Sequence, residues 1–170
     1  MIRLLALLFA FAVAPAHAAE GWERFFELSF GDLRAEALEA QKARQGLVVM
    51  YHFDACPYCT RMKNEVLARP DVQAHFRGRF RAISIDTRGA QEVTGFDGRT
   101  LRENEFARAH GVRATPTFQF YAADGTLLAT HVGAIYDPAV FMLLGDYVAS
   151  GAYANSTFTA YRQSKQKRGS

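Results

Sequence analysis

The two cysteines of the chain stand close together, in the tetrapeptide Cys56-Pro57-Tyr58-Cys59. Because the sequence holds no other cysteine, these two can form and break a disulfide only with each other within one chain. A disulfide across two residues closes almost no loop, so it would stabilise a fold very little. The spacing therefore favours a reactive pair over a structural bridge. The chemistry it predicts is thiol–disulfide exchange, in which a thiolate attacks a disulfide sulfur.

The sequence around this pair predicts the elements that position it. The apolar run Leu47–Phe53 is typical of a strand buried on both faces, and Thr60–Ala68 is typical of a helix. Cys56 would then lie at an exposed turn beside the helix N-terminus, where free backbone N–H groups and the helix dipole favour a thiolate. Cys59 would lie one helical turn further in. We therefore expect Cys56 to be the nucleophile and Cys59 the resolving thiol.

A metal site is not predicted. A zinc site needs three or four protein ligands, and the chain has no second cysteine pair. The histidines beyond the first residues are scattered and show no ligand spacing: His52, His75, His110 and His131. We expect neither a metal nor another cofactor.

The formal net charge of +3 does not indicate binding to nucleic acid. Five of the 20 basic residues lie near the two ends, and the 17 acidic residues outnumber those that remain. The five are Arg3, Arg162, Lys165, Lys167 and Arg168. We expect residues 164–170 to form a basic, disordered tail, for which a weak attraction to anionic lipid headgroups is an alternative.

The first residues predict export from the cytoplasm. Arg3 precedes the apolar run Leu4–Ala14, and the sequence Ala-His-Ala at 16–18 has the small-x-small pattern of a cleavage site. The apolar run is too short to span a bilayer as a helix. We expect residues 1–18 to be a signal peptide cleaved after Ala18, which implies a periplasmic protein. An uncleaved anchor or a buried helix is the alternative.

The rest of the chain predicts one α/β domain over residues 19–163. Its aromatic-rich start, residues 21–30, is expected to pack on the core as an N-terminal extension. Helices are predicted at 31–45, 70–76, 101–110, 138–148 and 153–163, strands at 80–85, 117–121 and 127–132, and a hairpin around 97–98. Strands that alternate with helices predict a parallel crossover unit, and the last two strands, which are joined by a hairpin, make the sheet mixed.

The element order and the CxxC at a helix start resemble the thioredoxin superfamily. Val112–Thr117 is similar to the segment of that family that carries a cis-proline facing the CxxC. The resemblance implies a thioredoxin fold: a central mixed four-stranded sheet flanked by helices, with N- and C-terminal helical extensions. It also implies that Pro116 is the cis-proline and that Thr115 and Pro116 bind the extended chain of the substrate.

Two further segments look like periplasmic thioredoxin-like proteins of the sulfur-oxidation (Sox) type, which resemble electron carriers of cytochrome c maturation. They are Val93–Gly98 and the end of the chain, with Gly151–Tyr153, Phe158 and Tyr161. This resemblance implies a monomer that reduces protein disulfides or mixed disulfides. It also implies that a membrane thiol carrier reduces the protein again.

The dipeptide between the cysteines departs from thioredoxin. Thioredoxin has Trp before the first cysteine and Gly-Pro between the two, whereas this chain has Ala55 before it and Pro57-Tyr58 between them. Pro-Tyr resembles the dipeptide of glutaredoxins. We expect Pro57 and Tyr58 to tune the reactivity of the pair.

A second departure concerns the base that activates the resolving thiol. Thioredoxin has a buried Asp six residues before the first cysteine, where this chain has Met50. The base for Cys59 is therefore unassigned. His52 and Asp54 are the nearest titratable candidates in the sequence, and His52 is also typical of a packed or surface histidine on a strand.

Three other functions remain open. A disulfide-forming oxidant is disfavoured because such relatives carry a large helical insert, for which residues 86–110 leave little room. A glutaredoxin-like protein shares the Pro-Tyr dipeptide, but glutathione is scarce outside the cytoplasm. A non-catalytic partner-binding module is the alternative of another class, and the intact CxxC argues against it.

Overall fold

The computed structural model describes residues 21–168, so the predicted signal peptide lies outside the described residues. The chain forms a four-stranded sheet in the order β2-β1-β5-β6. Its strands are β1 (Gly46–His52), β2 (Phe80–Asp86), β5 (Thr117–Tyr121) and β6 (Leu127–Val132). β1 and β2 are parallel, whereas β5 is antiparallel to both β1 and β6. The predicted mixed sheet is therefore confirmed.

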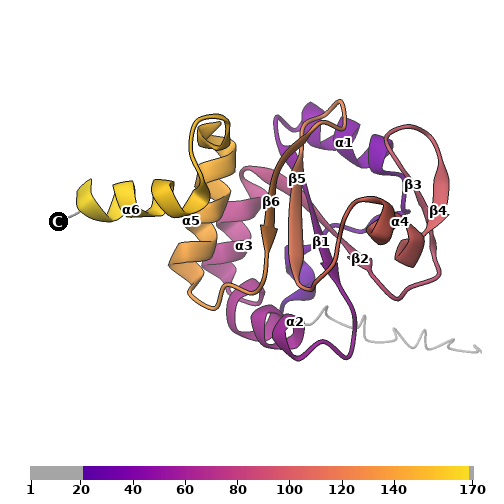
Figure 1. Ribbon diagram of the computed structural model, residues 1–170, viewed down its shortest axis with the longest axis horizontal. Coiled ribbons are helices and arrows are strands. Elements are labelled where there is room, and N and C mark those ends of the chain that lie inside the picture. The colour runs from indigo at the N-terminus through magenta and orange to yellow at the C-terminus, as the bar shows by residue number, and fades with distance from the viewer. Residues whose placement is uncertain (1–20, 169–170) are drawn as a thin grey trace, which may run out of the picture.

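Helices cover both faces of this sheet (Figure 1). One face carries α1 (Leu33–Lys42), α4 (Glu103–Ala109) and the hairpin of β3 (Glu92–Thr94) and β4 (Thr100–Arg102). The other carries α3 (Pro70–Arg77) and α5 (Pro138–Ala149), with α6 (Phe158–Arg168) beyond α5. Short 3-10 turns, η1 (Glu23–Phe25) and η3 (Ala152–Ala154), lie before α1 and before α6.

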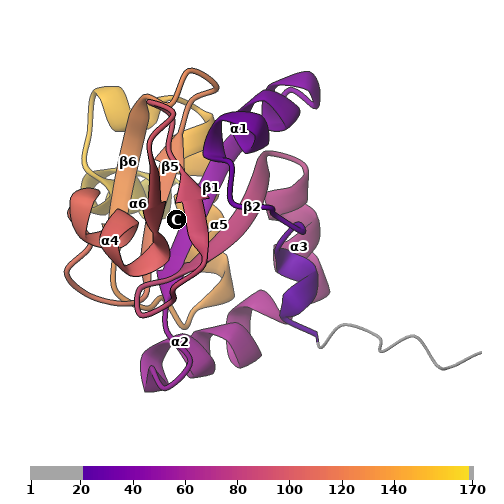
Figure 2. The same cartoon turned by 90° about the vertical axis from the view of Figure 1, so that its right-hand side faces the viewer.

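The helix of the cysteines lies at one end of the sheet. α2 (Pro57–Met62) continues directly into a π-helix, η2 (Lys63–Leu67). Figure 2 shows α2 below the sheet, next to the end of β1 from which the chain enters it. The cysteines are thus held between a rigid strand and a helix.

Two apolar clusters fix the sheet between its helical layers. In β1, Val48 and Met50 face the cluster that holds both cysteines, and Leu47, Val49 and Tyr51 face the other. Successive side chains on a strand point to opposite faces, so a strand covered on both sides must be apolar throughout. This explains why residues 47–51 of the strand are apolar without interruption.

The last helix differs from the prediction. The sequence predicted a helix at 153–163 and a disordered tail from 164, but α6 continues to Arg168. Phe158 and Tyr161 of this helix pack on Tyr147 of α5, with ring centroids 5.6 and 5.4 Å apart. Because this packing anchors the first turns, the Gln, Lys and Arg residues that follow extend the helix at little cost. Residues 164–168 are helical, which corrects the predicted disorder there.

Candidate active site

Cys56 is the N-cap residue of α2. Its backbone is extended, with φ −84° and ψ 107°, and its sulfur accepts a hydrogen bond from the backbone N–H of Cys59 at 3.2 Å. Pro57 occupies the first turn, where its missing N–H costs nothing. The helix therefore starts at Pro57 rather than at the predicted Thr60. One N–H group of its first turn, that of Cys59, is directed at the Cys56 sulfur, as expected for a sulfur at a helix N-terminus.

The two cysteines are joined by a disulfide, with their Cα atoms 5.2 Å apart. Cys56 is 2 % exposed and Cys59 is 1 % exposed. The expectation that Cys56 is exposed is therefore wrong for the disulfide form, because its sulfur is turned toward the loop before β5 rather than outward. Pro57 and Tyr58, which lie between the cysteines, are exposed instead. The two cysteines are almost equally buried, so burial does not indicate which one reacts first. The N-cap position of Cys56 does distinguish it from Cys59.

The loop before β5 brings Thr115 and Pro116 to this sulfur. The peptide bond between them is cis. The Thr115 hydroxyl donates a hydrogen bond to Cys56 Sγ at 3.3 Å, and the Thr115 carbonyl oxygen lies 3.8 Å from the same sulfur. The Gly133 N–H donates to the Pro116 carbonyl at 2.8 Å, which ties the loop to the end of β6. Residues far apart in the sequence thus meet at Cys56.

The two candidates for a base differ in environment. Asp54 is exposed, whereas His52 is buried at the end of β1. Burial lowers the pKa of His52, as does the neighbouring Lys63 ammonium, while Asp86 and Asp54 oppose this shift. His52 Nδ1 lies 3.2 Å from Lys63 Nζ.

Lys63 is a buried residue that the sequence analysis missed. It is only 7 % exposed, and its Nζ also lies 4.3 Å from the centre of the Trp22 ring. A lysine within a helical segment is normally expected on the solvent side, so the sequence alone did not predict that Lys63 is buried. The signal that indicates it is the spacing: Lys63 follows Cys59 by one helical turn, on the same face.

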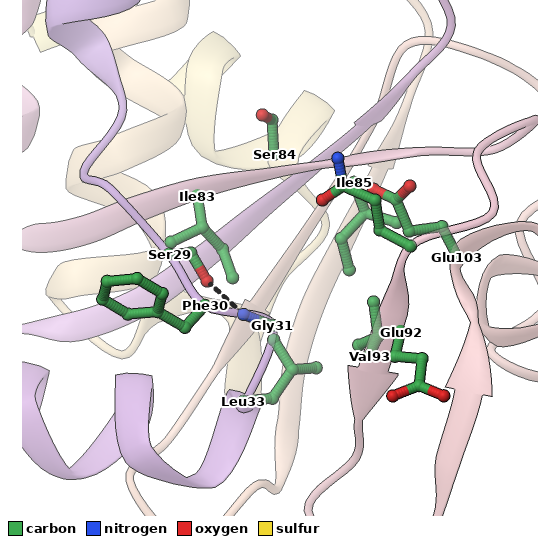
Figure 3. Close-up of a pocket in the computed structure, with 11 residues that line it drawn as sticks. Ser29, Phe30, Gly31, Leu33, Ile83, Ser84, Ile85, Glu92, Val93 and Glu103 are labelled. Carbon is green, nitrogen blue, oxygen red and sulfur yellow. Dashed lines mark hydrogen bonds between the residues drawn. The ribbon is translucent and has the colours of Figure 1, made fainter.

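Two cavities of the described residues are lined by side chains other than the cysteines. Figure 3 shows one of about 350 Å³, between β2, the segment before α1 and β3. Ile83 and Val93 line it, and the Ser29 hydroxyl there accepts a hydrogen bond from the Gly31 N–H at 3.1 Å. A second cavity, of about 480 Å³, is bordered by His52 and Asp54. Neither cysteine lines either cavity.

Residues 21–168 hold neither a candidate metal site nor a candidate membrane span. No group of three or more His, Cys, Asp or Glu side chains in this range is arranged to hold a metal ion. In the same range, no helix is both long enough and apolar enough to cross a membrane.

Solved structures with the same fold are found in several organisms. A thioredoxin-fold protein from Helicobacter pylori is 16 % identical, covers 86 % of this chain and 95 % of its own, and has a TM-score of 0.69. A thioredoxin from Thermus thermophilus is 27 % identical, covers 72 % of this chain and 88 % of its own, and has a TM-score of 0.55. The C-terminal domain of DsbD from Neisseria meningitidis in its reduced form is 16 % identical, covers 67 % of this chain and 90 % of its own, and has a TM-score of 0.50.

Among curated protein sequences, none matches this chain. The model of a protein family described as a thioredoxin-like domain matches residues 33–149, which include both cysteines and the loop of Thr115 and Pro116. A disulfide between cysteines two residues apart, at a helix N-terminus of this fold, is the reactive group of thiol–disulfide oxidoreductases. The match spans most of the sequence, and the chain therefore belongs to the thioredoxin-like domain family.

Proposed function

We propose that this chain is a periplasmic thiol–disulfide oxidoreductase that reduces protein disulfides or mixed disulfides through Cys56 and Cys59. The observation that carries the proposal is the set of donors around one sulfur. Cys56 Sγ accepts from the Cys59 N–H at 3.2 Å and from the Thr115 hydroxyl at 3.3 Å, at the positive end of α2. These groups stabilise negative charge on that sulfur, so Cys56 is the nucleophile and Cys59 the resolving thiol.

The reaction proceeds in two exchanges from the reduced protein. The Cys56 thiolate attacks one sulfur of the substrate disulfide, a mixed disulfide forms, and the other substrate sulfur leaves as a thiolate. The Cys59 thiol then loses its proton and attacks Cys56 Sγ, which releases the second substrate thiolate. Two electrons pass to the substrate, and the protein is left with the Cys56–Cys59 disulfide that the structure contains.

The substrate chain is expected to lie on the surface around Cys56. Tyr58, two residues after Cys56, is 64 % exposed. Val132, 60 % exposed, lies opposite Thr117 in the strand pairing, next to the loop of Thr115 and Pro116. Exposed apolar side chains of this kind suit an extended peptide whose disulfide enters between them. In this proposal Pro57 and Tyr58 tune the pair, and Thr115 and Pro116 bind the substrate backbone.

The Thr115 hydroxyl should set the redox potential of the pair. Thr115→Val removes the donor to Cys56 Sγ while keeping the shape of the side chain. Because a hydrogen bond to a charged group contributes about 1.5–3 kcal/mol, the reduced thiolate form should lose stability. The potential should fall by roughly 30–60 mV, measured by equilibration with dithiothreitol. Thr60→Val, an exposed position on α2, is the control. An unchanged potential in Thr115→Val contradicts this role.

The proposed location follows from the expected export, and the proposed partners follow from the resemblance to periplasmic carriers. In this proposal the chain is cleaved after Ala18 and acts as a monomer in the periplasm, where a membrane thiol carrier returns electrons to the disulfide. Residues 86–110 hold the β3–β4 hairpin and the seven-residue helix α4, without the large helical insert of a disulfide-forming oxidant. This arrangement supports reduction as the direction of the reaction.

The equilibrium potential of the Cys56–Cys59 pair tests the proposed direction. Protein is purified from the periplasm, its N-terminus at Ala19 is checked by mass spectrometry, and it is equilibrated with glutathione or dithiothreitol buffers. A potential of about −200 mV or lower is expected for an electron donor. A value of about −120 mV identifies an oxidant instead and overturns the proposed direction of electron transfer. A full-length mass in the membrane fraction contradicts the cleavage.

A further inference from the structure

A buried cation lies behind the disulfide, one helical turn beyond Cys59. Lys63 begins η2, directly after α2, and only 7 % of it is exposed. Residues four apart in a helix share a face, with their Cβ atoms about 6 Å apart. Helical side chains also lean toward the N-terminus of their helix, so the stem of Lys63 leans toward Cys59.

The contacts of Lys63 hold its ammonium inside the protein. Nζ donates to His52 Nδ1 at 3.2 Å, which requires the neutral imidazole to carry its proton on Nε2. The same Nζ lies over the Trp22 ring, 4.3 Å from its centre. The face of an indole attracts a cation, and a neutral imidazole nitrogen accepts a hydrogen bond from an ammonium group. Both contacts therefore suit the charged form of Lys63.

Burial and nearby carboxylates act on this cation in opposite directions. Desolvation lowers the pKa of Lys63, and the carboxylates of Asp54, Asp86 and Glu23 oppose that shift. Asp54 and Asp86 border, together with His52, the cavity of about 480 Å³ at the end of β1. On the side of the cysteines, the strand presents Met50, which is 1 % exposed and carries no charge.

We propose that Lys63 is the buried cation that stabilises the Cys59 thiolate, and that His52 and Trp22 are the positioning residues that hold it there. This inference rests on the proposed function of the Cys56–Cys59 pair. When Cys59 resolves the mixed disulfide, its proton passes to water and its electron pair forms the bond to Cys56 Sγ. A positive charge in an apolar surrounding favours that thiolate, because charges interact more strongly there than in water.

Replacing Lys63 separates its charge from its packing. Lys63→Met keeps an unbranched chain and removes the charge, so the reduced form loses stability at a pH high enough to ionise Cys59, which is the pH at which the potential is measured. We expect the equilibrium constant for forming the Cys56–Cys59 disulfide to rise about tenfold, a fall in potential of about 30 mV. Lys42→Met is the matched control, because Lys42 is an exposed lysine of α1 paired with Glu39. It changes the net charge equally but should leave the potential unchanged.

A second readout follows the resolving step itself. Reduced protein reacts with 5,5′-dithiobis(2-nitrobenzoate), and the release of the second thionitrobenzoate reports the attack of Cys59 on the mixed disulfide. The rate of this release should rise with pH as Cys59 ionises. The midpoint of that rise should lie about one pH unit higher in Lys63→Met than in the wild type, because a tenfold smaller ionisation constant of Cys59 shifts the midpoint by one unit. His52→Gln should shift the midpoint in the same direction by less.

The outcomes distinguish this inference from the proposed function. If Lys63→Met unfolds, as circular dichroism would show, His52→Gln carries the test, and no shift in its midpoint overturns the inference. The inference about Lys63 is also overturned if Lys63→Met and Lys42→Met have the same potential and the same midpoint. In that case the proposed function stands, provided that the wild type reduces a model protein disulfide. If the wild type fails to reduce that disulfide, the proposed function fails instead.

Discussion

Cys59→Ser is expected to accumulate mixed disulfides with other proteins, and Cys56→Ser is expected to accumulate none. The Cys56 sulfur has the two donors and the helix N-terminus that favour a thiolate, so we expect it to attack first. Without a thiol at position 59, nothing within the chain releases the trapped partner. Periplasmic extracts treated with an alkylating agent and run on non-reducing gels should show high-mass adducts of Cys59→Ser only, and mass spectrometry would identify the bound proteins.

Both variants should lose nearly all turnover with a model disulfide such as insulin, because each lacks one of the two exchanges. The double variant with Ser at both positions is the control, and it should form no adduct. If Cys56→Ser forms adducts and Cys59→Ser does not, the roles are reversed. If the double variant keeps the biological function, the chain is a partner-binding module and its thiols are dispensable.

The sequence predicted most of the fold because the residues that start and end its helices and strands are clear. β5 and β6 lie at the predicted residues 117–121 and 127–132, since Pro116 precedes the first strand and a Gly-containing turn separates the two. Asp137 and Pro138 likewise mark the start of α5, where the Asp137 carboxylate accepts the Ala139 N–H at 2.9 Å. These signals are local, so one sequence is sufficient to read them.

The errors concern features that depend on contacts distant in the sequence. The start of α2 was placed too late because its N-cap is a sulfur rather than one of the usual oxygen side chains. The burial of Cys56 depends on Thr115, which lies on another loop. The burial of Lys63 depends on Trp22 and on the end of β1, neither of which a helical pattern reveals. Tertiary packing decided each of these cases.

Phe141→Ala should lower the free energy of unfolding by about 3–5 kcal/mol, because it removes a fully buried ring and leaves a cavity. Phe141, in α5, has no exposed surface and stacks on Phe76 of α3, with ring centroids 4.4 Å apart. It also packs against Phe118 of β5 at 5.2 Å and Phe25 of η1 at 6.0 Å. One ring thus connects the sheet, two helices and the N-terminal extension, so its loss is not confined to one element.

Urea denaturation of the oxidised protein measures this loss, and Phe30→Ala is the matched control. Phe30 is 89 % exposed, so the same substitution there should change the free energy of unfolding by no more than about 0.5 kcal/mol. Equal losses at the two positions would contradict the packing described here. Because Phe141 lies on the helical layer and the donors to Cys56 Sγ come from Cys59 and Thr115, the folded fraction of Phe141→Ala should keep the wild-type redox potential. Stability and redox chemistry are then set by different residues, although Phe141 and both cysteines belong to one apolar cluster.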